Sequence, residues 1–243
     1  MGVEPPTTHQ GSKRRHKGMS IVRKALIGSA ILGIAAVASG DVLLDQIGPM
    51  DGSALAGNTY GSMHFLPDSP KTDDLGAVDN FTLDQANVLD SVEFVLDGWY
   101  YFDDPNDIVQ YEINIYSGIQ AVAENLIGDL YTSISEPVFI DSWTGPGYLL
   151  RLAIDVELEP GEYFLSVIMS NPYPDNGWVG VATSELGDDS AWAVSPNGDY
   201  VFSPFLATSD NLAYRVTGRA NVPAPASITL LIGVFCFTTR RRR

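Results

Sequence analysis

The chain has 243 residues, with 30 acidic and 14 basic side chains, which gives a formal net charge of −16. The imbalance is larger in the middle, because residues 41–220 hold 29 of the acidic residues and four basic ones, a net charge of −25. Such a surface repels phosphate backbones and anionic lipids, so the composition excludes nucleic-acid binding and favours divalent cations and basic partners. The only cysteine, Cys236, leaves this middle part without disulfides or thiolate chemistry.

Residues 1–40 have the features of a signal peptide with an extended basic n-region. Residues 19–24 supply a basic n-region through Arg23 and Lys24, and residues 25–37 form an apolar segment that is too short to span a bilayer. Ala36-Val37-Ala38 is a small-x-small cleavage site. We predict cleavage after Ala38, with Gly40 as the second choice. Because Met19 begins a complete signal peptide by itself, residues 1–18 are either an over-long n-region or the result of a start codon assigned too early.

Residues 41–220 alternate between apolar and polar side chains with a period of two, which is typical of strands that have one face on a core. The clearest run spans residues 150–158, and the alternation restarts at Tyr163 after Pro160-Gly161, a pair that fits the centre of a type II turn. We therefore predict a central hairpin over residues 150–169. Its buried side chains would be Leu152, Ile154, Val156, Leu165 and Val167.

Further strands are expected along the rest of this middle part, separated by dense turn signals such as Asp-Gly, Pro-Asn-Gly and Gly-Pro-Gly. The expected ranges are 42–46, 78–83, 92–96, 109–115, 138–143, 178–182, 191–194, 200–202 and 212–217, with a short helical turn within 120–130. Many short strands in about 180 residues predict an all-β fold, a two-sheet antiparallel sandwich of jelly-roll type, with a closed barrel as the alternative. A signal helix would precede this domain, residues 41–220, and a hydrophobic helix would follow it.

Catalytic signatures are scarce. After removal of the signal peptide one histidine remains, His64, and no nucleophile-elbow pattern accompanies it, so we interpret His64 as a turn or surface residue. Zinc would have to be held mostly by carboxylates, which is not its preferred ligand set. We predict that the protein is not an enzyme. The alternative is a secreted carbohydrate-active enzyme, because the abundant acidic residues offer many carboxylate pairs and the sequence does not give their separations.

Aromatic residues beside loops suggest a binding role. Aromatic faces stack on sugar rings, while neighbouring Asp and Asn side chains bond to hydroxyl groups. The alternative is that these rings fill the core of the sandwich or cover its edges. The candidate glycan-binding residues are Trp99, Trp143, Trp178, Trp192 and Tyr173.

One acidic turn is a candidate calcium site. Asp103, Asp104, Asn106 and Asp107 place four oxygen-bearing side chains within five residues, and Ca²⁺ takes six to eight hard oxygen ligands. Calcium is therefore the candidate cofactor. The alternative is a solvated acidic turn.

Residues 221–243 combine three features in a fixed order. Val222-Pro223-Ala224-Pro225 forms a Pro-x-Pro motif, an apolar run follows, and Arg240, Arg241, Arg242 and Arg243 end the chain. Residues 222–239 would span about 27 Å as a helix, which is near the lower limit for crossing a bilayer. The four arginines would stay on the cytoplasmic side.

This tail resembles the PEP-CTERM sorting signal of exported bacterial proteins, with Ala224 in the position where that family has Glu. The resemblance implies recognition by an exosortase-like membrane protease and delivery to the cell surface or to an extracellular polysaccharide matrix. We expect a structural or adhesive protein there, with glycan binding as the sharper hypothesis and membrane anchoring through the C-terminal helix. The alternative is a permanently tail-anchored surface protein, whose tail is not cleaved.

Overall fold

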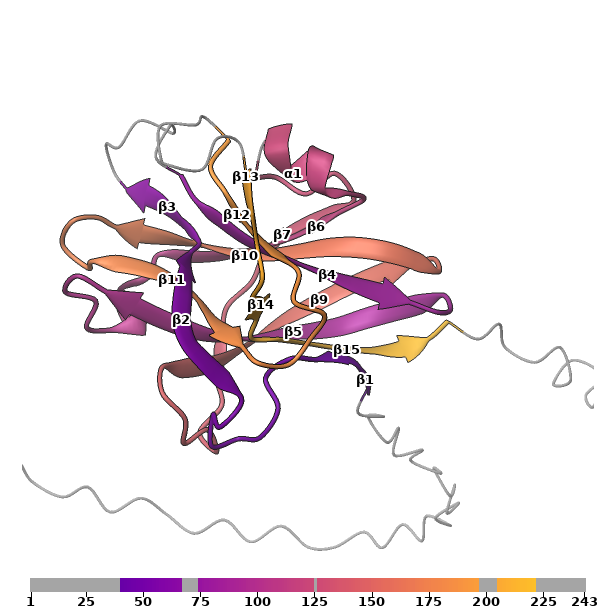
Figure 1. The fold of residues 1–243 in the computed structure, drawn as a ribbon, viewed down its shortest axis with the longest axis horizontal. Helices are drawn as coiled ribbons and strands as arrows, with labels where there is room; N and C mark the ends of the chain where they lie inside the picture. The colour runs from indigo at the N-terminus through magenta and orange to yellow at the C-terminus, as the bar shows by residue number, and fades with distance from the viewer. Residues whose placement is uncertain (1–39, 67–73, 125, 197–204, 222–243) are drawn as a thin grey trace, which may run out of the picture. The chain divides into compact units, whose positions relative to one another are not determined.

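A computed structural model describes residues 40–66, 74–124, 126–196 and 205–221 (Figure 1). In these ranges two β-sheets pack face to face, which confirms the predicted all-β sandwich. The predicted signal helix, the C-terminal helix and the strand at 200–202 lie outside them. None of the helices in these ranges combines the length and the apolar character that a membrane span requires.

The first sheet is organised around β5 (Asn87–Trp99). One side of β5 pairs with β9 (Tyr148–Leu158); the other side pairs with β15 (Tyr214–Ala220) and then, at its end, with β11 (Trp178–Ser184). The outer strands are β1 (Asp41–Asp45) on β15, β8 (Val138–Phe139) on β9, and both β2 (Leu55–Gly61) and β14 (Asn211–Leu212) on β11.

The second sheet is organised around β10 (Gly161–Pro172), which lies between β4 (Gly76–Leu83) and β6 (Gln110–Tyr116). The end of β10 also pairs with β3 (Met63–Leu66) in the parallel sense, whereas the other strand pairs of the described ranges are antiparallel. The outer strands are β12 (Ala191–Val194) and β13 (Phe205–Thr208) beyond β4, and β7 (Tyr131–Ile134) beyond β6.

The main core fills the space between the two sheets, and both outer faces are partly covered as well. Helix α1 (Ile119–Glu124) covers part of the second sheet, where Tyr116 and Ile168 are buried beneath it. The segment between β1 and β2 covers part of the first sheet, where Val95 and Leu149 are buried with Ile47. Because these segments cover the outer faces, several strands bury side chains on both faces. Their apolar and polar residues therefore alternate less clearly than in a strand with one face exposed to solvent.

The predicted hairpin over residues 150–169 is wrong, although both of its strands exist. Strand β9 pairs with β5 and β8 in the first sheet, and β10 pairs with β4, β6 and β3 in the second, so Pro160 lies in a connection that crosses between the sheets. Gly161 does not have the positive φ that a type II turn requires. The phenol of Tyr163 donates to the carbonyl of Glu159 (2.7 Å) across this connection.

The predicted burial along these strands is confirmed for four of the five side chains. Of the five predicted side chains, Leu152, Ile154, Leu165 and Val167 are buried, and Val156 is half-buried against the main core. The inward faces of β9 and β10 therefore meet across the core, where a hairpin would have placed them side by side in one sheet.

Other boundaries differ from the prediction in smaller ways. The strand expected at 138–143 is only the two residues of β8, because the chain turns at 141–142. Strands β2, β3, β7 and β13 were not predicted, and the helical turn expected within 120–130 is α1.

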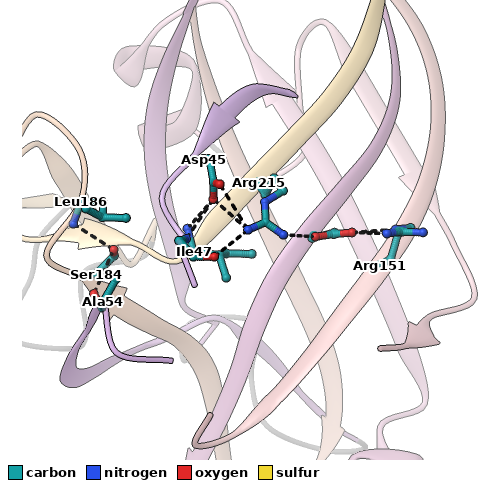
Figure 2. Close-up of polar contacts among 9 residues, drawn as sticks. Asp45, Ile47, Ala54, Arg151, Ser184, Leu186 and Arg215 are labelled. Carbon is teal, nitrogen blue, oxygen red and sulfur yellow. Dashed lines mark hydrogen bonds and ion pairs between the residues drawn. The ribbon is translucent and has the colours of Figure 1, made fainter. Parts of the chain in front are cut away.

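Two arginines share a buried carboxylate on the outer face of the first sheet. Cross-strand register places Arg151 of β9 and Arg215 of β15 on either side of Glu93, which is 3% exposed. Arg151 Nε donates to Glu93 (2.7 Å), Arg215 Nη1 donates to its other oxygen (2.9 Å), and Arg215 also pairs with Asp45 (3.1 Å). Figure 2 shows Arg215 between Asp45 and the carboxylate that it shares with Arg151.

Candidate functional site

Five aromatic side chains from distant parts of the sequence meet at one end of the sandwich. Trp99 ends β5 and Trp178 begins β11, and the register pairs the two residues directly, with ring centroids 5.8 Å apart. Around Trp178 lie Phe65 of β3 at 5.3 Å, Tyr173 at 6.1 Å and Tyr100 at 6.4 Å, in edge-to-face contacts. We call these five residues the aromatic cluster.

Two loops frame the aromatic cluster, the β5–β6 loop (residues 100–109) and the β10–β11 loop (residues 173–177), which lie side by side in Figure 1. Buried amides join them. Asn171 donates its side-chain N–H to the carbonyls of Gly177 (2.9 Å) and Asn176 (3.2 Å). Asn176 in turn donates to Oδ1 of Asn171 (2.9 Å) and to the carbonyl of Asp104 in the other loop (3.4 Å). Hydrogen-bonded buried amides of this kind fix loop geometry before any ligand arrives.

Gly177 allows the two loops to approach each other closely. It has a φ of +61°, and a Cβ at this position would lie 2.4 Å from the carbonyl oxygen of Tyr100 and 2.5 Å from the amide nitrogen of Phe102. Only a residue without a side chain fits such a backbone contact. The glycine is therefore part of the architecture that positions the aromatic rings.

Three tyrosines at this end are exposed, and two of them have strained backbones. Tyr101 is 86% exposed, Tyr100 68% and Tyr173 40%. Tyr100 and Tyr101 have φ values of 52° and 76°, in the left-handed region that bulky residues rarely occupy. Backbone strain of this kind costs on the order of 1–3 kcal/mol per residue and concentrates at binding and active sites.

The acidic turn in the β5–β6 loop is a helix cap. Asp104 is the N-cap of the short 3-10 helix η2 (Pro105–Asp107), and its carboxylate accepts from the backbone and side-chain nitrogens of Asn106 (2.8 and 2.7 Å). The phenol of Tyr111 anchors the turn by donating a hydrogen bond to the carbonyl of Pro105 (2.9 Å). Burial raises the pKa of this phenol.

Within the described ranges, no group of three or more His, Cys, Asp or Glu side chains has a metal-binding arrangement, and calcium binding at this turn stays a prediction. Asp103, Asp104, Asn106 and Asp107 are all described and exposed. The side-chain N–H of Asn106 donates to the carboxylate of Asp104, which caps this solvated turn.

Exposed carboxylates nevertheless give this end a negative charge. Asp103 follows Tyr101 by two residues and Asp175 follows Tyr173 by two, and all four side chains are exposed. The arginines of the described ranges lie elsewhere, since Arg151 and Arg215 flank Glu93 and Arg219 pairs with Asp90. Glu93, which pairs with Arg151 and Arg215, lies six residues before Trp99 in β5, which corresponds to about 20 Å along the strand.

The other two candidate tryptophans have packing roles. Trp143 lies against Gly52 and Gly145 on the outer face of the first sheet, and its Nε1 donates to the carbonyl of Pro146 (3.2 Å). Trp192 packs edge-to-face on Phe164 (5.2 Å) on the outer face of the second sheet. The structure therefore brings together Trp99, Trp178 and Tyr173 of the predicted glycan-binding residues, and it separates Trp143 and Trp192 from them.

His64 is neither in a turn nor fully exposed, which corrects the expectation from sequence. It lies in β3, is half-buried, and its Nδ1 is 2.8 Å from Oδ2 of Asp74. Asp74 also accepts from the backbone N–H of Phe65 (3.2 Å), so the pair helps to anchor the strand that carries one ring of the aromatic cluster.

A cavity of about 140 Å³ lies beside the β5–β6 loop, between that loop and the segment that joins β7 to β8. Its lining includes the exposed apolar side chains of Val109, Ile134 and Phe139. Its lining contains one carboxylate, Glu136.

Three members of this end were not among the candidate residues from sequence. Tyr100 and Tyr101 stand next to Trp99, so the aromatic run itself was a signal. Phe65 offered no such signal, because its position depends on the parallel pairing of β3 with β10.

The predicted sorting residues Val222, Pro223, Ala224, Pro225 and Arg240–243 lie outside the described residues.

No family model matches the sequence, and no curated protein matches it. Among solved structures, the chain is similar to one titled "AvmM Catalyzes Macrocyclization in Alchivemycin A Biosynthesis", with 11% identity over 71% of this chain and 92% of that one. The TM-score of 0.22 is too low for this likeness to carry an argument about fold or function.

Proposed function

We propose that this protein is exported to the cell surface or to an extracellular polysaccharide matrix, where it has a structural or adhesive role and binds polysaccharide through its aromatic end. By the aromatic end we mean the aromatic cluster together with Tyr101. The observation that carries the proposal is the convergence of the five rings of the aromatic cluster from three separate segments, with Tyr100, Tyr173 and the adjacent Tyr101 left exposed.

The chemistry of this end suits sugars. Exposed tyrosine faces can stack on the C–H faces of sugar rings, while nearby Asp and Asn side chains bond to hydroxyl groups. Trp178 packs against the rings of Tyr100 and Tyr173, and Trp99 packs against Trp178. The buried amides of Asn171 and Asn176 hold both loops in place. A platform that is ordered in advance loses less conformational entropy on binding.

The proposed location rests on the two ends of the sequence. The signal-peptide pattern of residues 1–40 supports export, and the Pro-x-Pro, apolar and arginine order of residues 221–243 supports sorting by an exosortase-like protease. The C-terminal helix would hold the protein at the membrane, either until cleavage or permanently.

A binding role fits the described site better than catalysis does. Glycoside hydrolysis uses two carboxyl groups that face each other, and the cavity beside the β5–β6 loop is lined by a single one, Glu136. His64, in strand β3, is paired with Asp74, and the sequence near His64 has no nucleophile-elbow pattern.

The test is a screen of the full chain, in a polyoxyethylene detergent, against a broad panel of bacterial and plant polysaccharides. Tyr101→Ala and Tyr173→Ala should each weaken binding by about tenfold or more, as expected for central aromatic contacts. Tyr101→Ala should leave the melting temperature nearly unchanged, because its side chain is 86% exposed. Leu206→Ala, which removes an exposed apolar side chain from β13, is the matched control and should not alter binding. Failure of every polysaccharide to bind would overturn the proposal.

A further inference from the structure

The exposed carboxylates beside the tyrosines are uncommitted. Asp103 and Asp175 take part in no hydrogen bond or ion pair within the described residues, in contrast to Asp104, which caps η2. Each lies two residues after an exposed tyrosine, one in each loop. The aromatic end therefore offers aromatic faces and free carboxylates together.

Local positive charge that could neutralise them is absent from the described part of this end. Arg151, Arg215 and Arg219 all pair with carboxylates at or before Glu93 along β5, well away from Trp99. With 29 acidic and four basic residues in the range 41–220, the wider surface adds to the negative potential. Polymers of uronic acids or sulfated sugars would be repelled from this end, whereas ammonium groups would be attracted to it.

We infer that the polysaccharide bound at the aromatic end carries free amino groups, as in a polymer of amino sugars with unacetylated amines. This inference rests on the proposed function and adds the chemical class of the ligand. The tyrosine faces contact the sugar rings, and the carboxylates of Asp103 and Asp175 pair with protonated amines along the polymer. Charge complementarity and ring stacking then act on the same ligand.

A basic peptide would satisfy the charge but not the geometry. Peptides that bind β-sandwiches commonly add a strand to an open sheet edge, where unpaired backbone groups give affinity. At the aromatic end the two loops meet through their own backbones, with Gly177 against Tyr100 and Phe102. The exposed features are side chains, which favours a ligand that is recognised by stacking and by charge.

The experiment measures binding of the full chain, in the same detergent at pH 5.5, to three hexamers: glucosamine, N-acetylglucosamine and galacturonic acid. The glucosamine hexamer should bind about fivefold or more tightly than the N-acetylated one at 50 mM NaCl, and the difference should shrink at 500 mM. The galacturonic acid hexamer should not bind. Asp103→Asn with Asp175→Asn should remove most of the preference for free amines, and Tyr101→Ala should weaken binding of both amino-sugar hexamers.

A matched control separates a local effect from the overall charge. Asp84→Asn with Glu159→Gln makes the same change in charge at exposed positions near the opposite end of β5, about 40 Å of strand away, and should leave the preference intact. Equal loss in both double variants, equal binding of the two amino-sugar hexamers, or binding of a lysine hexamer that matches glucosamine and survives Tyr101→Ala would overturn the inference. If the wider polysaccharide panel contains binders but free amines confer no advantage, this inference fails while the proposed function stands.

Discussion

Asn176 donates its side-chain N–H to the side-chain oxygen of Asn171, 2.9 Å away, and both residues are buried beneath the loops of the aromatic end. Replacing Asn171 by Ala would leave the carbonyls of Asn176 and Gly177 without their donor. Each buried group left unsatisfied costs about 1–3 kcal/mol.

Asn171→Ala should therefore lower the free energy of unfolding and weaken polysaccharide binding together, whereas Tyr101→Ala, at a side chain that is 86% exposed, should weaken binding alone. Urea unfolding and a binding titration on both variants make the comparison. If Asn171→Ala binds normally, these amides do not position the site.

The main core should be most sensitive along β9. Leu152 has no exposed surface, and Leu152→Ala should cost about 2–5 kcal/mol through lost burial and the cavity it leaves. Val138→Ala, at a side chain that is 58% exposed in the neighbouring strand β8, should cost less than about 0.5 kcal/mol. Equal costs in urea unfolding would mean that the inner face of β9 has been assigned wrongly.

The two arginines that share Glu93 should not be equivalent. Arg215 is 15% exposed at its side chain and bridges Glu93 to Asp45, whereas Arg151 is 50% exposed. Removing a buried partner of a buried charge costs about 3–5 kcal/mol, while exposed pairs are worth about 0–1 kcal/mol. Arg215→Ala should therefore destabilise the protein by clearly more than Arg151→Ala, as measured by thermal unfolding at fixed pH; the reverse order would contradict the burial difference.

Asp79 should make stability depend on pH. Burial raises the pKa of this carboxyl from its ordinary value of 3.8 to about 7, against the lowering effect of the N–H groups of Leu212 and Asn80 that donate to it. A raised folded-state pKa stabilises the fold at low pH, and that contribution is lost as the pH rises from about 4 to about 7.

Through this window Asp79 should lower the free energy of unfolding by up to about 1.4 kcal/mol per pH unit. Asp79→Asn removes the titration, so the slope should flatten by that amount relative to the unchanged chain. Parallel slopes in the two proteins, measured by urea unfolding between pH 4 and pH 8, would show that Asp79 does not titrate in this range.

Processing at both ends can be read from the mass of the protein isolated from its native host. The signal pattern predicts a mature N-terminus at or close to Ser39 or Asp41, and the tail pattern predicts loss of Arg240–243. Intact-mass analysis that finds all four arginines would instead indicate a permanent tail anchor.

Local patterns in the sequence were enough to identify most strands and the two loops that matter. The alternation over residues 150–158 identified β9 and its buried face, because a side chain's preference for an apolar environment can be seen residue by residue. The aromatic and acidic residues of the β5–β6 and β10–β11 loops were recognisable as candidates for the same reason.

Which strands pair, and which loops meet, was decided only by the tertiary structure. Alternation specifies the face of a strand but not its partner, so β9 and β10 fitted a hairpin as well as a crossing between sheets. The choice depends on contacts between segments far apart in the chain, such as β9 with β5 and β10 with β4. The same long-range pairing placed Trp99 opposite Trp178, brought Phe65 beside them, and left Trp143 and Trp192 to pack on the outer faces of the two sheets.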